Sequence, residues 1–145
     1  MIDIIHKGST SFFIDEDGKD HVIPLFSTSR YIAEGKFTVK IEGLEKHYKS
    51  ITHDLGITKK HTVHLYVSPK NSKSFPTHTD PIDVFIYVIE GTKVMEVDNF
   101  THTIKEGEYI SIPAGTPHRA INIHDSTMLS IGVENSPLHS CENVL

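Results

Sequence analysis

The chain has 145 residues, of which 37% are hydrophobic and 23% charged, values typical of a soluble globular protein forming a single domain over residues 1–145. Its formal net charge of −5 argues against a broad nucleic-acid-binding surface, and no apolar run reaches the roughly 18 residues of a membrane span. The single cysteine, Cys141, cannot form a disulfide within the chain, and the first residues lack the pattern of a signal peptide. A cytoplasmic location is therefore expected.

The first part of the chain is predicted to hold short strands and two helices. Residues 1–26 favour strands interrupted by a turn at 15–18. A short helix is predicted over 27–35, capped by Ser27 or Ser29 and ended by Gly35, and a strand follows over 37–41. A second helix is predicted over 44–55, ended by Gly56.

From residue 61 onward the pattern becomes that of a β-rich domain. Short β-forming runs recur about every 8–12 residues and are separated by Gly, Pro and Asn, which favours an all-β sandwich or barrel. A turn at Gly91-Thr92 is predicted to separate two of these strands. The predicted strands cover residues 61–67, 84–89, 93–97, 100–104, 108–112, 119–123 and 127–133.

Residues 107–122 match the pattern G-x5-P-x-G-x2-H-x3-N at every fixed position. Pro113 and Gly115 predict a tight turn, after which His118 begins a strand and points into the mouth of a barrel. This segment resembles the second conserved motif of the cupins. The resemblance implies a cupin, or double-stranded β-helix (jelly-roll), barrel with one or two short N-terminal helices and a metal-binding core over about 61–135.

The segment that corresponds to the first cupin motif departs from the usual H-x-H-x3-4-E pattern. It reads His78-x-Asp80, with Val84 at the usual glutamate position, and His118 follows 38 residues after Asp80. Two histidines and one carboxylate form the ligand set typical of non-haem iron(II) oxygenases. Residues two apart on a strand face the same side, so one metal could take both His78 and Asp80. Asp83 is the alternative carboxylate.

The region 65–97 resembles the jumonji-type oxygenases, in particular the ribosomal oxygenases, and the resemblance extends over about 35–135. It implies an Fe(II)- and 2-oxoglutarate-dependent oxygenase, or hydroxylase, in which His78, Asp80 and His118 are the catalytic metal ligands. The matching segments are Tyr66-Val67-Ser68-Pro69, Asn71-Ser72, Phe75-Pro76, His78-Thr79-Asp80 and Gly91-Thr92-Lys93.

Three further residues are candidates for binding the co-substrate. Lys93 lies 13 residues after Asp80, where the family places a lysine that pairs with the far carboxylate of 2-oxoglutarate. His64 falls where the ribosomal oxygenases carry an asparagine near the co-substrate. The Tyr66 hydroxyl could point inward, although packing in the core is the alternative. Asn122 is expected to support the barrel turn.

Two other functional classes remain open. One is a cupin metalloenzyme that does not use 2-oxoglutarate, such as a dioxygenase or isomerase, and the other is a non-catalytic cupin binding or sensor domain. Lys93 distinguishes the oxygenase from these two classes, since neither of them needs a lysine at this position. The given chain ends at Leu145 without the dimerisation and winged-helix parts of ribosomal oxygenases, so a ribosomal protein substrate is not inherited. The expected substrate is a small molecule or peptide, without nucleic-acid or membrane partners, and a homodimer is left open.

Overall fold

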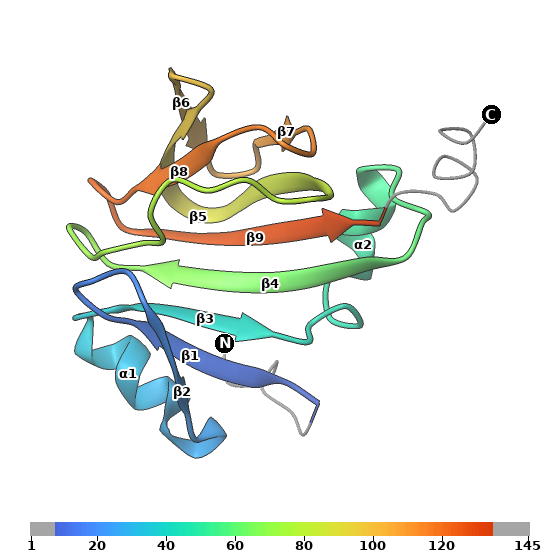
Figure 1. The fold of residues 1–145 in the computed structure, drawn as a ribbon. Coiled ribbons are helices and arrows are strands. Elements are labelled where there is room, and N and C mark those ends of the chain that lie inside the picture. Colours follow the sequence, from blue (N-terminus) through green and yellow to red (C-terminus); the bar gives the residue numbers. More distant parts are fainter. Residues whose placement is uncertain (1–7, 135–145) are drawn as a thin grey trace.

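The computed structural model describes residues 8–134, which fold into an antiparallel β structure with few, short helices (Figure 1). One path of paired strands runs in the order β2-β1-β3-β4-β9-β5-β6, and β7 and β8 also pair with β5. The predicted all-β class is therefore confirmed, whereas Cys141 and the predicted strand residues before Gly8 lie outside the described residues. The strands are β1 (Thr10–Ile14), β2 (Asp20–Ile23), β3 (Thr38–Glu42), β4 (His61–Ser68), β5 (Asp83–Val97), β6 (Phe100–Lys105), β7 (Tyr109–Ile112), β8 (His118–Ile121) and β9 (Ser126–Val133).

Strand β5 is the centre of the barrel. Its first part pairs with β7 and β9, and its last part pairs with β6 and β8. The predicted turn at Gly91-Thr92 is wrong, because β5 continues through it after a register shift between Val88 and Glu90. Gly91 has φ +78°, and a Cβ there would lie 2.2 Å from the carbonyl oxygen of Asp125. Glycine thus bends the strand at an irregular step in the ladder instead of reversing it.

The helices agree with the sequence in one case and differ in the other. Helix α1 (Thr28–Glu34) follows the short 3-10 helix η2 (Leu25–Ser27) and ends at Gly35, as predicted, although Ser27 makes no capping bond through its side chain. Helix α2 (Lys49–Asp54) is shorter than the predicted 44–55. Within residues 8–134, no helix has the length and apolar character that a membrane crossing requires.

Contacts with β4 explain why α2 begins late. The backbone N–H of Leu44 donates to the carbonyl oxygen of Val63 at 3.2 Å, and the Val63 N–H donates to the Glu45 carboxylate at 2.8 Å. Leu44 is fully buried in the core. These tertiary contacts hold residues 44 and 45 beside the strand, and the helix begins only at Lys49.

Two apolar clusters lie on opposite faces of the same strands. Val63 and Leu65 of β4 belong to the cluster that also packs against side chains of α1 and α2. The second cluster lines the barrel interior and includes Ile86 and Met95 of β5 and Met128 of β9. Side chains alternate along a strand, so Val63 and Leu65 face one side of β4. The residue between them, and every second residue from it, face the barrel interior. This alternation places polar side chains of β4 inside the barrel.

Candidate metal centre and its cavity

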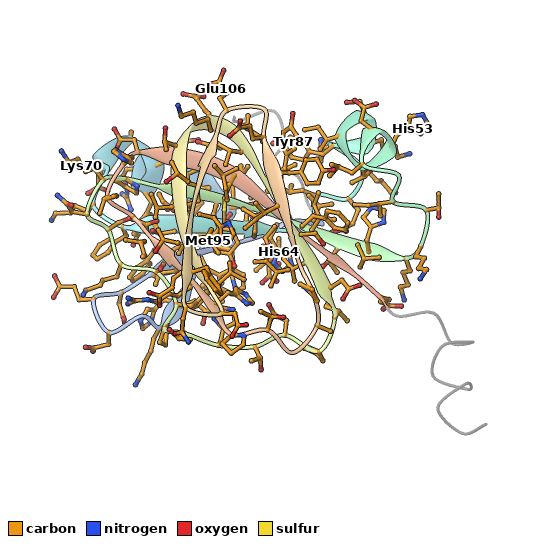
Figure 2. The ribbon with its side chains drawn as sticks, turned by 90° about the horizontal axis from the view of Figure 1, so that it is seen from above. His53, His64, Lys70, Tyr87, Met95 and Glu106 are labelled. Carbon is orange, nitrogen blue, oxygen red and sulfur yellow. The ribbon has the colours of Figure 1, made fainter. Side chains whose placement is uncertain are left out.

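A cavity of about 440 Å³ lies inside the barrel, a size typical of small-molecule sites. Strand β4 lines it with every second residue, namely Thr62, His64, Tyr66 and Ser68. Figure 2 shows His64 and Met95 toward the centre of the molecule, whereas His53 and Lys70 lie at its periphery. The remaining wall combines apolar side chains with the three predicted metal ligands and Lys93. The apolar residues include Phe75, Ile82, Val84, Ile86, Met95 and Met128.

His78, Asp80 and His118 are brought together at this cavity. One potential ligand atom from each lies within 4.8 Å of the others. Asp80 Oδ2 is 3.1 Å from His118 Nε2 and 3.8 Å from His78 Nε2. His118 is buried, while His78 and Asp80 are partly accessible, with side chains 40% and 34% exposed. The group is therefore a candidate metal site that solutes can reach.

Backbone pairing, and not a shared strand, aligns these three residues. His78 and His118 form an isolated antiparallel bridge, with N–H to carbonyl distances of 3.1 and 2.9 Å. The Asp80 carbonyl oxygen accepts a hydrogen bond from Gly115 at 2.8 Å, within the turn that precedes β8. The expectation that His78 and Asp80 occupy one regular strand is wrong, because Asp80 lies in a loop. Its position is fixed through the Pro113–Gly115 turn instead.

Both histidine rings are oriented by a backbone carbonyl. His78 Nδ1 is 2.8 Å from the Pro76 oxygen, and His118 Nδ1 is 2.8 Å from the Thr116 oxygen. A carbonyl oxygen only accepts hydrogen bonds, so each Nδ1 must carry the proton. In the neutral form of each ring the lone pair is then on Nε2, the atom that faces Asp80. Metal-binding histidines usually hold their other ring nitrogen against a backbone carbonyl or carboxylate in this way, and the residues therefore fit a divalent metal ion.

Asp83 does not join this group among the described residues. Its Oδ1 accepts a hydrogen bond from the backbone N–H of Ala114 at 2.8 Å. It therefore supports the same turn from outside, and Asp80 is the carboxylate that lies between the two histidines.

Lys93 is the largest fully buried side chain in the described part of the protein, with 1% exposure. It lies inside β5, two residues after Gly91, and lines the cavity. Its ammonium donates to Asn122 Oδ1 at 2.7 Å and to Ser68 Oγ at 3.2 Å. No described carboxylate forms an ion pair with it. Burial of the charged form lowers the pKa of Lys93 to about 7.

His64 and Tyr66, the other two candidates for co-substrate binding, also line the cavity. Burial lowers the pKa of His64, so its ring is neutral near pH 7, and burial raises the pKa of the Tyr66 phenol. The Tyr66 ring contacts Phe75 edge-on, with ring centroids 6.3 Å apart. Both side chains are thus uncharged parts of the cavity wall, and Tyr66 also has the packing role considered above.

The sequence did not indicate two residues of this site. Lys40 of β3 lines the cavity while its ammonium pairs with Asp20 at 2.9 Å and Glu42 at 3.0 Å. A lysine within a strand is usually solvent-exposed, so no local signal marked it. Asn122 was expected only to support a turn, yet it contacts Lys93 directly. Its fixed position in the motif, four residues after His118, was the available signal.

Comparison with known proteins agrees with this architecture. Residues 64–132 match the family model described as a cupin domain. A search of curated protein sequences finds no match. YcfD, a ribosomal oxygenase from Escherichia coli solved with cobalt and succinic acid, superposes with a TM-score of 0.73 at 15% identity, over 97% of this chain and 44% of YcfD. The chain thus spans less than half of that enzyme.

Other solved structures share the barrel. The complex of YcfD with cobalt and 2-oxoglutarate gives a TM-score of 0.72, also at 15% identity and over the same 97% and 44% of the two chains. An RmlC-like cupin from Shewanella frigidimarina gives 0.53 at 13% identity, over 70% of this chain and 80% of that one. The described residues therefore have the cupin fold that the sequence predicted, and residues 64–132 match the cupin model.

Proposed function

We propose that this protein is an Fe(II)- and 2-oxoglutarate-dependent oxygenase that hydroxylates an amino-acid side chain or a small molecule. The observation that carries the proposal is the content of one cavity. It holds a two-histidine, one-carboxylate ligand set together with Lys93, a buried cation that has no carboxylate partner among the described residues. An anionic co-substrate would supply that partner.

The ligand set suits iron(II). His78 and His118 would each give a neutral Nε2, and Asp80 would give one negative oxygen, leaving coordination positions open for other molecules. Iron(II), when bound, supplies the chemistry that activates oxygen. Overall, 2-oxoglutarate and O2 become succinate and CO2. One oxygen atom enters succinate and the other enters a substrate C–H bond, so the two oxidations supply the four electrons that O2 accepts.

Lys93 would bind the carboxylate of 2-oxoglutarate that is remote from the metal. Its ammonium is buried, and two of its three N–H groups already donate hydrogen bonds to neutral oxygens of Asn122 and Ser68. A charge-assisted hydrogen bond in such a water-poor site is stronger than one between neutral groups. The apolar side chains around the cavity would keep water from competing for the anion.

The shared fold supports the same proposal. YcfD has been solved with cobalt and 2-oxoglutarate, and its barrel superposes on nearly all of this chain. At 15% identity this likeness concerns the fold, so Lys93 and the three ligand residues carry the functional argument.

Formation of succinate from 2-oxoglutarate in the presence of iron(II) and ascorbate tests the proposal without a known substrate. We expect slow turnover by the wild type and none by Asp80→Ala or Lys93→Ala. Asp83→Asn is the matched control, because it removes a nearby negative charge outside the ligand group and keeps the oxygen that accepts from Ala114.

Calorimetry on the metal-loaded protein should show 2-oxoglutarate binding that depends on Lys93. No turnover together with no binding by the wild type would overturn the proposal. Metal binding that still required Asp80 would then favour a cupin metalloenzyme that does not use 2-oxoglutarate, and no metal binding would favour a non-catalytic cupin domain.

A further inference from the structure

Asn122 lies at the centre of a buried hydrogen-bond network between Lys93 and the loop that precedes His78. Its side chain is 7% exposed. Oδ1 accepts from the Lys93 ammonium at 2.7 Å, and Nδ2 donates to the carbonyl oxygen of Ser72 at 3.1 Å. Nδ2 is also 3.3 Å from Ser72 Oγ and 3.4 Å from Thr38 Oγ1. The amide therefore connects residues that are distant in the sequence.

The orientation of this amide follows from its partners. The Ser72 carbonyl can only accept a hydrogen bond, and the Lys93 ammonium can only donate. Nδ2 must face Ser72, so Oδ1 must face Lys93. The backbone of Asn122 adds a further restraint, since its carbonyl oxygen accepts from the Asn71 N–H at 2.6 Å. The acceptor oxygen thus cannot turn away from Lys93 without losing hydrogen bonds at both ends.

The geometry also determines where Lys93 can donate. Two of the three ammonium N–H groups are taken by Asn122 and Ser68. The third has no acceptor among the described residues, and Lys93 lines the cavity. That N–H is therefore the one available to a bound anion.

We propose that Asn122 is a positioning residue for Lys93: its fixed amide oxygen holds the ammonium and leaves one N–H for a carboxylate in the cavity. This inference rests on the proposed function, because it assigns a role at the same co-substrate site. It goes further by making anion binding depend on a side chain that itself touches neither the anion nor the metal ligands.

The protonation of Lys93 is the property that Asn122 should control. An amide oxygen at 2.7 Å stabilises the ammonium form more than the neutral amine, because the charged group is the stronger donor. Removing that oxygen should lower the pKa of Lys93, and replacing it by a carboxylate should raise it. The titratable and charged groups that share the cavity with Lys93 are Lys40, His64, Tyr66, His78, Asp80 and His118. All of these remain unchanged in the variants below.

The test is a pH titration of Lys93 by NMR on metal-free, 13C-lysine-labelled protein, with Lys93→Met identifying the signal. In the wild type we expect a pKa of about 7. Asn122→Leu should lower this pKa by about one pH unit, a tenfold change in the protonation equilibrium. Asn122→Asp should raise it by a similar amount. Ser72→Ala is the matched control, because it removes a hydroxyl on the Nδ2 side and retains the oxygen that Lys93 contacts.

A purely structural role for Asn122 predicts a different pattern. The variants would then lower the melting temperature while the titration of Lys93 stayed where it is in the wild type, and that result would overturn the inference. Asn122→Asp keeps the side-chain size, so it decides the question even if the leucine variant does not fold.

Calorimetry separates this inference from the proposed function. Wild-type protein loaded with manganese(II) should bind 2-oxoglutarate at pH 6.5, and Asn122→Leu should weaken that binding about threefold. A pKa that falls from about 7 to about 6 lowers the protonated fraction of Lys93 at this pH from about three-quarters to about one-quarter. If the wild type does not bind, the proposed function fails, while the NMR titration still tests the contact between Asn122 and Lys93. If the wild type binds and the leucine variant binds equally well, the positioning role of Asn122 is refuted and the proposed function stands.

Discussion

Replacement of Lys93 by methionine should make the protein more stable near neutral pH, and under the proposed function it should also abolish binding of 2-oxoglutarate. The ammonium is 1% exposed and has only neutral hydrogen-bond partners among the described residues. Its burial therefore opposes folding whenever the side chain is charged. Methionine has a similar length and fills the same space without a charge.

The magnitude follows from linkage between protonation and folding. The pKa of Lys93 falls from 10.5 to about 7 in the folded protein. This difference of about 3.5 pH units corresponds to about 5 kcal/mol that the charged form loses on folding. Methionine leaves Asn122 Oδ1 without its donor, which costs about 1–3 kcal/mol. A net gain of roughly 2–4 kcal/mol at pH 7 remains, or roughly 5–10 °C in Tm for a chain of this size.

The difference in stability between the wild type and Lys93→Met should depend on pH. Below pH 7 Lys93 is protonated in both the folded and the unfolded chain, so the full penalty applies. Between about pH 7 and 10.5 the unfolded chain holds one more proton, and the stability of the wild type therefore rises with pH relative to the variant. At pH 10 the advantage of Lys93→Met should have shrunk by about 4 kcal/mol.

Urea unfolding of both metal-free proteins from pH 6 to pH 10 measures this difference. The two curves of unfolding free energy should converge as pH increases. Parallel curves, or a variant that is less stable than the wild type at every pH, would refute this reasoning. Either result would show that folding does not disfavour the charged form of Lys93.

The other predictions concern the metal group and the bend in β5. Asp80→Ala should lower the affinity for divalent metal at least tenfold in a metal titration, whereas Asp83→Asn, which keeps the oxygen that accepts from Ala114, should retain it. Equal loss in both variants would contradict the assignment of Asp80. Gly91→Ala should destabilise the protein by about 3 kcal/mol or more, because a Cβ there would collide with a backbone oxygen at 2.2 Å. Gly107→Ala, with φ +82° but open space around it, should cost only about 1–2 kcal/mol by the same urea assay, and equal effects would refute the role of the close contact.

Local chemistry explains what the sequence alone could predict. Pro113 and Gly115 determine a turn whatever surrounds them, so the start of β8 at His118 was predictable. Gly35 ends α1 in the left-handed conformation that glycine favours. The β-forming residues at 61–67 likewise predicted the strand that the structure shows as β4.

Contacts between residues distant in the sequence determined the parts of the fold that local patterns did not predict. Gly91 signalled a turn by its local propensity, yet pairing with β9 on one side and the approach of Asp125 made it a bend within a continuous strand. Leu44 and Glu45 would extend a helix in isolation, but their bonds to Val63 hold them beside β4. In both cases tertiary hydrogen bonds outweigh a local preference of about 1 kcal/mol or less per residue.

For the candidate site, the sequence determined which residue types are present, and only the tertiary structure decided their arrangement. The spacing of His78, Asp80 and His118 predicted a metal group, but their alignment comes from a bridge and a turn that join segments 40 residues apart. Lys93 meets Asn122 across 29 residues and Ser68 across 25. Burial and hydrogen bonding at such separations depend on how the strands pair, which no local pattern specifies.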